Sequence, residues 1–260
     1  MAFPYRTALV TGASSGLGRE FARLLAAQGS DLVLVARRED RLAELAAELT
    51  AAHAVRVEVL AADLGEDKDV LRVAERLADP SRPVELLVSN AGYDQSGFFH
   101  EHAPDVAPAE LAVNLVAPVR LCRAALPGMI AAGHGGIVMV SSAVASMPLP
   151  KSAVYGASKA FLTSFAESLF MEAAGTGVHV TSIAAGLIRS EFHARAGIDT
   201  AGMPKAAWME PEPVAAAGLK AVAAGKAAVI PGAFNKIQWP FYKIMPRRML
   251  RAMVKRFYRE

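Results

Sequence analysis

The feature that most constrains the fold is the regular alternation of short apolar runs with longer helical patterns. Seven runs rich in Val, Leu and Ile are predicted to be strands, and about six helices lie between them. The runs lie at residues 7–10, 31–36, 55–60, 84–88, 137–141, 178–183 and 227–230. They are apolar at successive positions, as expected of strands that helices cover on both faces. The pattern therefore predicts an α/β fold with a doubly wound parallel sheet of about seven strands.

The chain has 260 residues, of which 53% are hydrophobic, which suits one large domain over residues 1–235 with an extension at 236–260. Its lone cysteine, Cys122, has no partner for an intrachain disulfide, and no charged leader with a long apolar run precedes the first strand. We therefore expect a cytoplasmic location. Residues 111–130 are interrupted by charges and prolines, so they are not predicted to span a membrane.

A glycine-rich stretch, TGASSGLG at residues 11–18, joins the first predicted strand to the first predicted helix. At that edge of a parallel sheet, the helix N-terminus offers unpaired N–H groups and partial positive charge to a phosphate. Gly12, Gly16 and Gly18 would let a pyrophosphate approach the main chain, and Ser14 and Ser15 would add hydroxyl donors. The spacing differs from the usual dinucleotide fingerprint, and alone it is equally consistent with a tight turn.

The end of the second predicted strand, LVLVARRED, indicates which dinucleotide would bind. Ala36 stands where a carboxylate would hold a free ribose 2′-hydroxyl, and Arg37 and Arg38 follow it. Because guanidinium groups match a phosphate in charge and geometry, we infer a 2′-phosphate and hence NADP(H). The alternative, solvated arginines at a helix start, suits Arg38 better than Arg37. Asp63 is a candidate to contact the adenine amino group, or is an ordinary aspartate at a helix start.

A candidate catalytic pair lies in the segment SSAVASMPLPKSAVYGASKAF. Tyr155 and Lys159 are four residues apart and so share one helix face. A nearby ammonium group favours the phenolate form of a tyrosine, which would make Tyr155 a proton donor and acceptor. Such a pair also occurs by chance on helix surfaces. Ser141 and Ser142, however, end the fifth predicted strand at the edge that carries the glycine-rich loop.

Several of these motifs together resemble the short-chain dehydrogenase/reductase family, over residues 7 to about 232. The resemblance rests on Gly12, Gly16, Gly18, Asn90-Ala91-Gly92, Asn114, Ser142, Tyr155 and Lys159. It implies a Rossmann-type fold in which Tyr155 exchanges a proton with the substrate oxygen and Lys159 holds the nicotinamide ribose. Ser142 would bind the carbonyl, and Asn114 would support a water in a proton relay.

The full set of expected cofactor contacts follows from the loop, the arginines and this resemblance. It comprises Gly12, Ser14, Ser15, Gly16, Leu17, Gly18, Arg37, Arg38, Asp63, Leu64, Asn90, Ala91, Gly92, Tyr155, Lys159, Gly186, Ile188 and Ser190. The chain departs from the family pattern at Ser89, where asparagine is usual, at Ala185, where proline is usual, and at Ser190, where threonine is common. Among the roles that the resemblance implies, placement of the nicotinamide by the loop with Ala185 and Ser190 has the least support from the motifs.

Residues 187–213 form a long connection with weak periodicity, which we interpret as a mobile lid; the alternative is an ordinary surface excursion with a short helix. Apolar residues predicted to border the site suggest a mostly apolar substrate pocket. They are Phe98, Phe99, Met147, Leu149, Phe192, Met203, Trp208 and Met209. His193 lies in the lid and is a candidate substrate contact. His100 and His102 lack a further clustered ligand set, so no metal site is predicted.

The resulting functional hypothesis is an NADP(H)-dependent reductase of a lipophilic ketone or 3-oxoacyl-type substrate. One alternative is an alcohol or hydroxysteroid dehydrogenase working in the oxidative direction. Another is a non-catalytic NADP(H)-binding sensor or regulator. The resemblance implies a homodimer or homotetramer.

The basic residues concentrate at the C-terminal end. Residues 236–260 hold eight Lys and Arg and one Glu, which leaves residues 1–235 with 20 basic and 24 acidic side chains. The acidic main part gives no support to nucleic-acid binding. The pairs Met249-Leu250, Met253-Val254 and Phe257-Tyr258 recur every four residues among arginines, which predicts a basic amphipathic helix. It would contact an anionic membrane peripherally, or pack on its own or a partner subunit.

Overall fold

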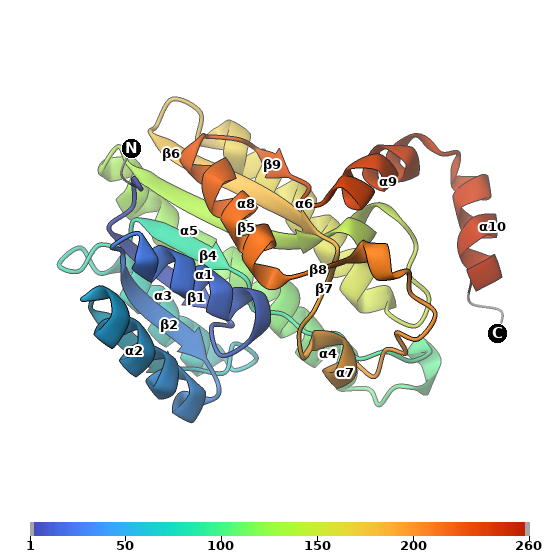
Figure 1. Cartoon of the computed structure of the whole chain (residues 1–260), viewed down its shortest axis with the longest axis horizontal. Helices are drawn as coiled ribbons and strands as arrows, with labels where there is room; N and C mark the ends of the chain where they lie inside the picture. The colour runs from blue at the N-terminus through green and yellow to red at the C-terminus, as the bar shows by residue number, and fades with distance from the viewer. Residues whose placement is uncertain (1–2, 258–260) are drawn as a thin grey trace.

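A seven-stranded parallel sheet forms the centre of the computed structural model, which describes residues 3–257. The strand order is β3-β2-β1-β4-β5-β6-β9, and every neighbouring pair is parallel (Figure 1). The strands are β1 (Thr7–Thr11), β2 (Asp31–Ala36), β3 (Val57–Ala61), β4 (Leu86–Ser89), β5 (Gly135–Ser142), β6 (Val178–Ala185) and β9 (Ala228–Val229). The predicted α/β class and parallel sheet are confirmed.

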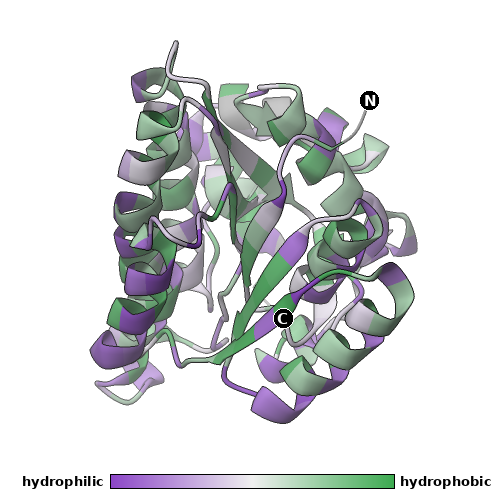
Figure 2. Cartoon of the chain, turned by 90° about the vertical axis from the view of Figure 1, so that its left-hand side faces the viewer, coloured by the Kyte–Doolittle hydropathy of each residue, from purple (hydrophilic) through white to green (hydrophobic). Residues whose placement is uncertain are grey.

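Two layers of helices cover the sheet, as the continuous apolar runs predict. Helices α1 (Gly16–Ala27), α2 (Glu39–His53) and α8 (Pro211–Ala223) share a core with Val10 and Leu34. Helices α3 (Asp67–Ala78), α5 (Ala117–Ala131) and α6 (Ala153–Glu172) share a second core with Leu9 and Val35. Figure 2 shows the hydrophobic strands between the two helix layers. Neighbouring strand residues point to opposite faces, so both positions must be apolar.

The strand order places a crevice at the edge where the candidate motifs end. The chain passes from β3, at one edge, to β4 beside β1, so the direction of winding reverses between β1 and β4. Ligands of open α/β sheets bind outside the carboxyl ends of the strands at such a switch point. The glycine-rich loop follows β1 and Asn90 follows β4, so both lie at this position.

Residues Val106–Ala131 form one long helical unit made of α4 (Val106–Leu111), a π-helical turn at Ala112–Val116 and α5. Within residues 3–257 it is the one helix long and apolar enough to cross a membrane by length and composition. It buries Leu121, Ala125 and Met129 in the second core. These three residues pack on the sheet, while Val116 and Ile130 of the same unit are exposed.

The lid contains a small parallel ribbon that the sequence did not predict. β7 (Leu187–Ile188) pairs with β8 (Trp208–Met209), and between them lie α7 (Phe192–Arg195) and a 3-10 turn at Lys205–Ala207. The Arg189 amide also donates to the Met209 carbonyl at 3.0 Å. Both ends of the excursion are thus fixed to each other.

The C-terminal extension forms two helices where one was predicted. α9 (Ala233–Ile244) begins just before the predicted boundary, and α10 (Arg247–Phe257) follows after Pro246. Figure 1 shows both helices standing out from the sheet at the end of the molecule where the lid lies. Tyr258 and Arg259, which belong to the predicted amphipathic pattern, lie outside the described residues.

Candidate active site

The glycine-rich loop is held tightly against the end of β4. Gly12 has a positive φ of 69°, and a Cβ on Gly18 would overlap the Gly12 carbonyl and lie 2.6 Å from Asn90 Nδ2. Asn90 Nδ2 donates to the Thr11 carbonyl at 2.8 Å, so the asparagine joins β4 to β1. A side chain at Gly12 or Gly18 would push these strand ends apart. The glycines therefore have a packing reason in addition to any ligand.

The first turn of α1 has neither a capping side chain nor a carboxylate. Its N-cap, Ser15, makes no side-chain capping bond, and no acidic residue lies in the first turn. The N-terminal N–H groups therefore keep their partial positive charge, which suits a pyrophosphate. Leu17 and Leu64 are buried beside this edge, and the Ala91 amide donates to Thr11 Oγ1 at 3.0 Å.

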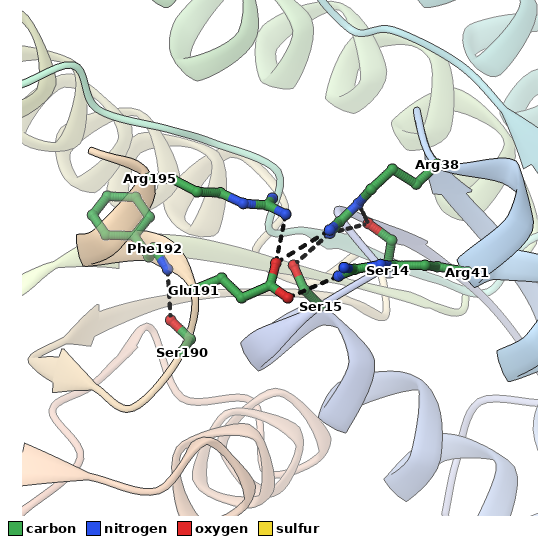
Figure 3. Close-up of polar contacts among 8 residues, drawn as sticks. All are labelled: Ser14, Ser15, Arg38, Arg41, Ser190, Glu191, Phe192 and Arg195. Carbon is green, nitrogen blue, oxygen red and sulfur yellow. Dashed lines mark hydrogen bonds and ion pairs between the residues drawn. The ribbon is translucent and has the colours of Figure 1, made fainter. Parts of the chain in front are cut away.

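The two arginines after β2 differ in position. Arg38 donates to Ser14 Oγ at 2.8 Å and to Ser15 Oγ at 2.9 Å, so its guanidinium lies over the loop (Figure 3). Arg37 is 71% exposed and lies 3.6 Å from Asp63. Asp63 also accepts from the Gly65 amide at 2.9 Å, as a turn aspartate does. The structure reverses the sequence interpretation, in which Arg38 was the more solvated arginine, because Arg38 is the N-cap of α2 and turns toward the loop.

A lid carboxylate joins this cluster. Glu191 pairs with Arg38 at 3.1 Å, with Arg41 at 2.8 Å and with Arg195 (Figure 3). Hydrogen bonds from Arg41 and Arg38 lower the pKa of Glu191 to about 2. Sequence reasoning missed Glu191 and Arg41. Arg41 is one helical turn after Arg38, which was a usable signal, whereas Glu191 is 153 residues away.

Tyr155 and Lys159 lie on one face of α6, as predicted. Lys159 Nζ is 5.6 Å from the centre of the Tyr155 ring and donates to the Val140 carbonyl at 2.9 Å. Burial lowers the pKa of Lys159 to about 8. Burial also raises the pKa of Tyr155, and the opposing hydrogen bond with Ser142 is the smaller effect. Burial therefore favours the protonated phenol, whereas the sequence analysis expected the ammonium group to favour the phenolate.

The two serines at the end of β5 have separate roles. Ser141 donates to the Lys159 carbonyl at 2.8 Å and shares a 2.6 Å hydrogen bond with Thr163, so it fastens α6 to β5. Ser142 forms the hydrogen bond with Tyr155, and its hydroxyl is 3.3 Å from the Ala185 carbonyl. Of the two serines, Ser142 is the one that faces Tyr155.

Asn114 sits in the π-helical turn, a local widening of a helix that often marks functional positions. It accepts from the Tyr93 amide at 3.0 Å and donates to the Tyr93 carbonyl at 2.7 Å. A Cβ on Gly92 would lie 2.9 Å from Asn114 Oδ1 and 3.4 Å from Lys159 Nζ. The glycine of the Asn90-Ala91-Gly92 segment thus allows Asn114 and Lys159 to approach the same strand end.

Two buried carboxyl groups lie behind Asn114, and the sequence analysis missed both. Glu110, 2% exposed, has Oε1 3.4 Å from Asn114 Nδ2. Asp94, 4% exposed, accepts from Ser152 Oγ at 2.6 Å. Burial and the charge of Asp94 raise the pKa of Glu110 to about 7. Glu110 precedes Asn114 by one helical turn, the only sequence signal available.

The lid segment packs against Tyr155 through Phe192. The Phe192 ring lies 5.5 Å from the Tyr155 ring, centre to centre, while the His193 ring packs 4.8 Å from Trp208 inside the lid. Ser190 accepts from the Phe192 amide at 3.3 Å, and Ile188 pairs with Met209. Phe98 and Phe99, also predicted to border the site, are 46% and 63% exposed.

The loop after β6 needs glycine for a local reason. A Cβ on Gly186 would overlap the side chain of Asn235, which donates to the Pro231 carbonyl at 3.0 Å. Ala185 accepts from Ser142, so its carbonyl faces the site without a proline. Among the residues that the structure describes, no three His, Cys, Asp or Glu side chains are grouped to hold a metal ion.

The profile of the short chain dehydrogenase family matches residues 6–200. The chain belongs to this family. A curated short chain dehydrogenase relative is sulfoacetaldehyde reductase 2 of Chromohalobacter salexigens, 41% identical over 189 residues that cover 71% of this chain and 73% of the relative. These matches confirm the resemblance that the motifs carry.

Solved structures of short chain dehydrogenases have the same fold over most of the chain. One from Sphingobium yanoikuyae, in complex with NADPH, superposes with a TM-score of 0.84 at 35% identity, over 90% of this chain and 91% of that one. A bulky-bulky ketone specific alcohol dehydrogenase from Comamonas testosteroni gives 0.78 at 28% identity, over 95% and 96%.

Proposed function

We propose that the protein is an NADP(H)-dependent oxidoreductase that transfers hydride between the nicotinamide and the carbonyl carbon of a lipophilic ketone or 3-oxoacyl-type substrate. The observation that carries the proposal is the meeting of Tyr155, Lys159 and Ser142 at the sheet edge that also holds the glycine-rich loop and Arg38. Acid chemistry and dinucleotide binding therefore share one crevice.

The residues of the crevice fit this cofactor. The free N-terminus of α1 and the glycine-rich loop would hold the pyrophosphate, and Arg38 with Ser14 and Ser15 would hold the 2′-phosphate. The NADPH bound by the Sphingobium yanoikuyae relative supports the same choice. When bound, the cofactor supplies or accepts the hydride.

The protein residues stabilise the charge that appears on the substrate oxygen. In the reductive direction Tyr155 donates its proton to that oxygen, and the Ser142 hydroxyl donates a hydrogen bond to it. The Lys159 ammonium, held by the Val140 carbonyl, stabilises the phenolate that forms. Asn114 would hold a relay water that returns a proton to Tyr155.

The proposed substrate class rests on the apolar residues that adjoin Tyr155. Phe192 lies against the tyrosine, and the pairing of β7 with β8 holds Trp208 in the lid behind it. The ketone-specific relative supports a ketone, and the aldehyde reductase relative supports the reductive direction. We expect turnover of ketones to rise with alkyl length in an NADPH absorbance assay; better turnover of small hydrophilic ketones would contradict the apolar pocket.

Replacement of Tyr155 by phenylalanine tests catalysis directly. Tyr155→Phe removes the proton donor, so turnover should fall by about 10²-fold or more. Fluorescence titration should give an NADPH affinity within about threefold of the wild type, because the tyrosine is not needed to hold the phosphates. Unchanged activity of the variant, or no activity of the wild type on any carbonyl or alcohol tested, would favour a sensor instead of an enzyme.

We also propose that the protein works in the cytoplasm as a homodimer or homotetramer. Apolar side chains are exposed at Val116 in the π-helical turn, at Ile130 on α5, and at Phe161 and Met171 on α6. Burying such a face between copies would remove it from water. Light scattering after size-exclusion chromatography checks this proposal, and a monomer at micromolar concentration would refute it.

A further inference from the structure

Helix α9 carries an apolar stripe that the rest of the described chain leaves uncovered. Phe234, Ile237, Phe241 and Ile244 follow one another at steps of three, four and three residues, so they share one helix face. Ile237 is 77% and Ile244 80% exposed. Exposed isoleucines spaced along a whole helix face differ from the scattered apolar residues of ordinary surfaces, and they indicate a contact surface.

Along the chain, the charged residues next to this stripe are all basic. The sequence has no acidic residue between Glu212 and Glu260, and α10 adds Arg248, Arg251 and Arg256, all exposed. No ion pair within residues 3–257 involves these three arginines. The surface is therefore complementary to one that is apolar inside and anionic at its boundary.

The apolar residues of α10 follow the second of the two predicted alternatives, packing on the chain's own subunit. Leu250 and Val254 are 0% and 3% exposed, so they pack inside the protein and do not face solvent. Met249 is exposed and leads from α9 onto the basic face of α10. The buried pair holds α10 in place, while α9 presents the apolar side chains.

We propose that α9 and α10 form a docking surface for an anionic lipid bilayer. The α9 stripe would enter the boundary between headgroups and acyl chains, and the α10 arginines would contact lipid phosphates. A nucleic acid would attract the same arginines but would leave the isoleucines in water. A second copy of this chain would bring an equally basic surface against the first, which is electrostatically unfavourable.

This surface adjoins the proposed active site. α9 contacts the 3-10 turn that follows Ser142, at Ala143–Ser146, and the lid turn at Lys205–Ala207. Arg247 donates to the Ser146 carbonyl at 3.3 Å. Docking would thus bring the lid and the end of β5 close to lipophilic substrate dissolved in the bilayer. This last step rests on the proposed function, whereas the docking itself does not.

The test is co-sedimentation of the full chain with vesicles of phosphatidylcholine alone or with added phosphatidylserine. The wild type should bind the anionic vesicles at least tenfold more strongly, and more weakly as salt rises. Ile237→Glu with Ile244→Glu should reduce binding at least tenfold. Leu71→Glu, at a 51% exposed leucine on α3, is the matched control and should bind as the wild type does. Thermal melting and NADPH titration check that each variant is folded.

Three results would overturn the proposal. The first is equal binding of the wild type to neutral and anionic vesicles. The second is undiminished vesicle binding by the double variant. The third is that the wild type binds no vesicles while the double variant changes from oligomer to monomer. The last result would assign the stripe to a contact between copies. Tyr155→Phe should sediment with anionic vesicles as the wild type does, so docking can fail or hold independently of catalysis.

Discussion

The different positions of Arg37 and Arg38 make a sharp prediction about cofactor selectivity. Arg38 is 26% exposed and already bonded to Ser14 and Ser15, so a phosphate there meets a guanidinium that is held in place. Hydrogen bonds to charged groups contribute about 1.5–3 kcal/mol. We take the lower half of that range because solvent reaches the site, so Arg38→Gln should weaken NADPH binding about 10- to 40-fold.

Arg37→Gln is the matched comparison. Its side chain is 71% exposed, and an exposed charge pair is worth about 0–1 kcal/mol, so NADPH binding should weaken at most about fivefold. Both variants should bind NADH within about twofold of the wild type, because that cofactor lacks the 2′-phosphate. Calorimetric or fluorescence titration at one fixed salt concentration measures all six constants. A larger loss of NADPH affinity in Arg37→Gln than in Arg38→Gln would refute the assignment, and tighter binding of NADH than NADPH by the wild type would refute the selectivity altogether.

Two further predictions concern pH. The pKa of Lys159 is about 8, while that of Tyr155 is raised. The value of kcat/KM for carbonyl reduction should therefore fall above about pH 8, because the Lys159 ammonium group is lost there. A value of kcat/KM that stays constant to pH 10 would show that this charge is not needed. The carboxyl group of Glu110 is protonated more readily in the folded state, with a pKa of about 7, than in the unfolded chain near 4.5. Its contribution to the free energy of unfolding is therefore complete below pH 4.5 and is lost as pH rises to about 7. Glu110→Gln removes this loss. The difference in free energy of unfolding between the variant and the wild type, measured by urea denaturation, should therefore shift in favour of the variant by on the order of 3 kcal/mol from pH 4.5 to pH 8. A difference that is independent of pH would contradict the assignment.

Local chemistry in the sequence was enough to predict the sheet and the placement of Tyr155 and Lys159 on one helix face. The apolar runs are long and the helices between them are regular, so all seven strands of the main sheet appear where expected. Tyr155 and Lys159 are related by a helix turn, which the sequence alone defines. Ser142 follows from its place at a strand end.

The remaining features depend on contacts between distant segments. Nothing near Arg38 indicates that Glu191, from the lid, will pair with it. β7 and β8 have two residues each, and at least 19 residues separate them in the sequence. Each is a strand only because it pairs with the other. The burial of Glu110 depends on how the π-helical turn packs against the loop after β4. In α10, the amphipathic pattern was correct, but only the tertiary structure shows that Leu250 and Val254 face inward.

The ribbon of β7 and β8 has a consequence for how new specificity can arise. The Leu187–Trp208 and Ile188–Met209 pairs bring the two ends of the excursion together, and the interval between them meets the rest of the chain through side chains such as Glu191 and Phe192. Insertions, deletions or exchanges in that interval would alter which molecules reach Tyr155 without disturbing the strands below. Grafting the corresponding interval from a relative with another substrate should therefore transfer preference while the melting temperature of the host changes little.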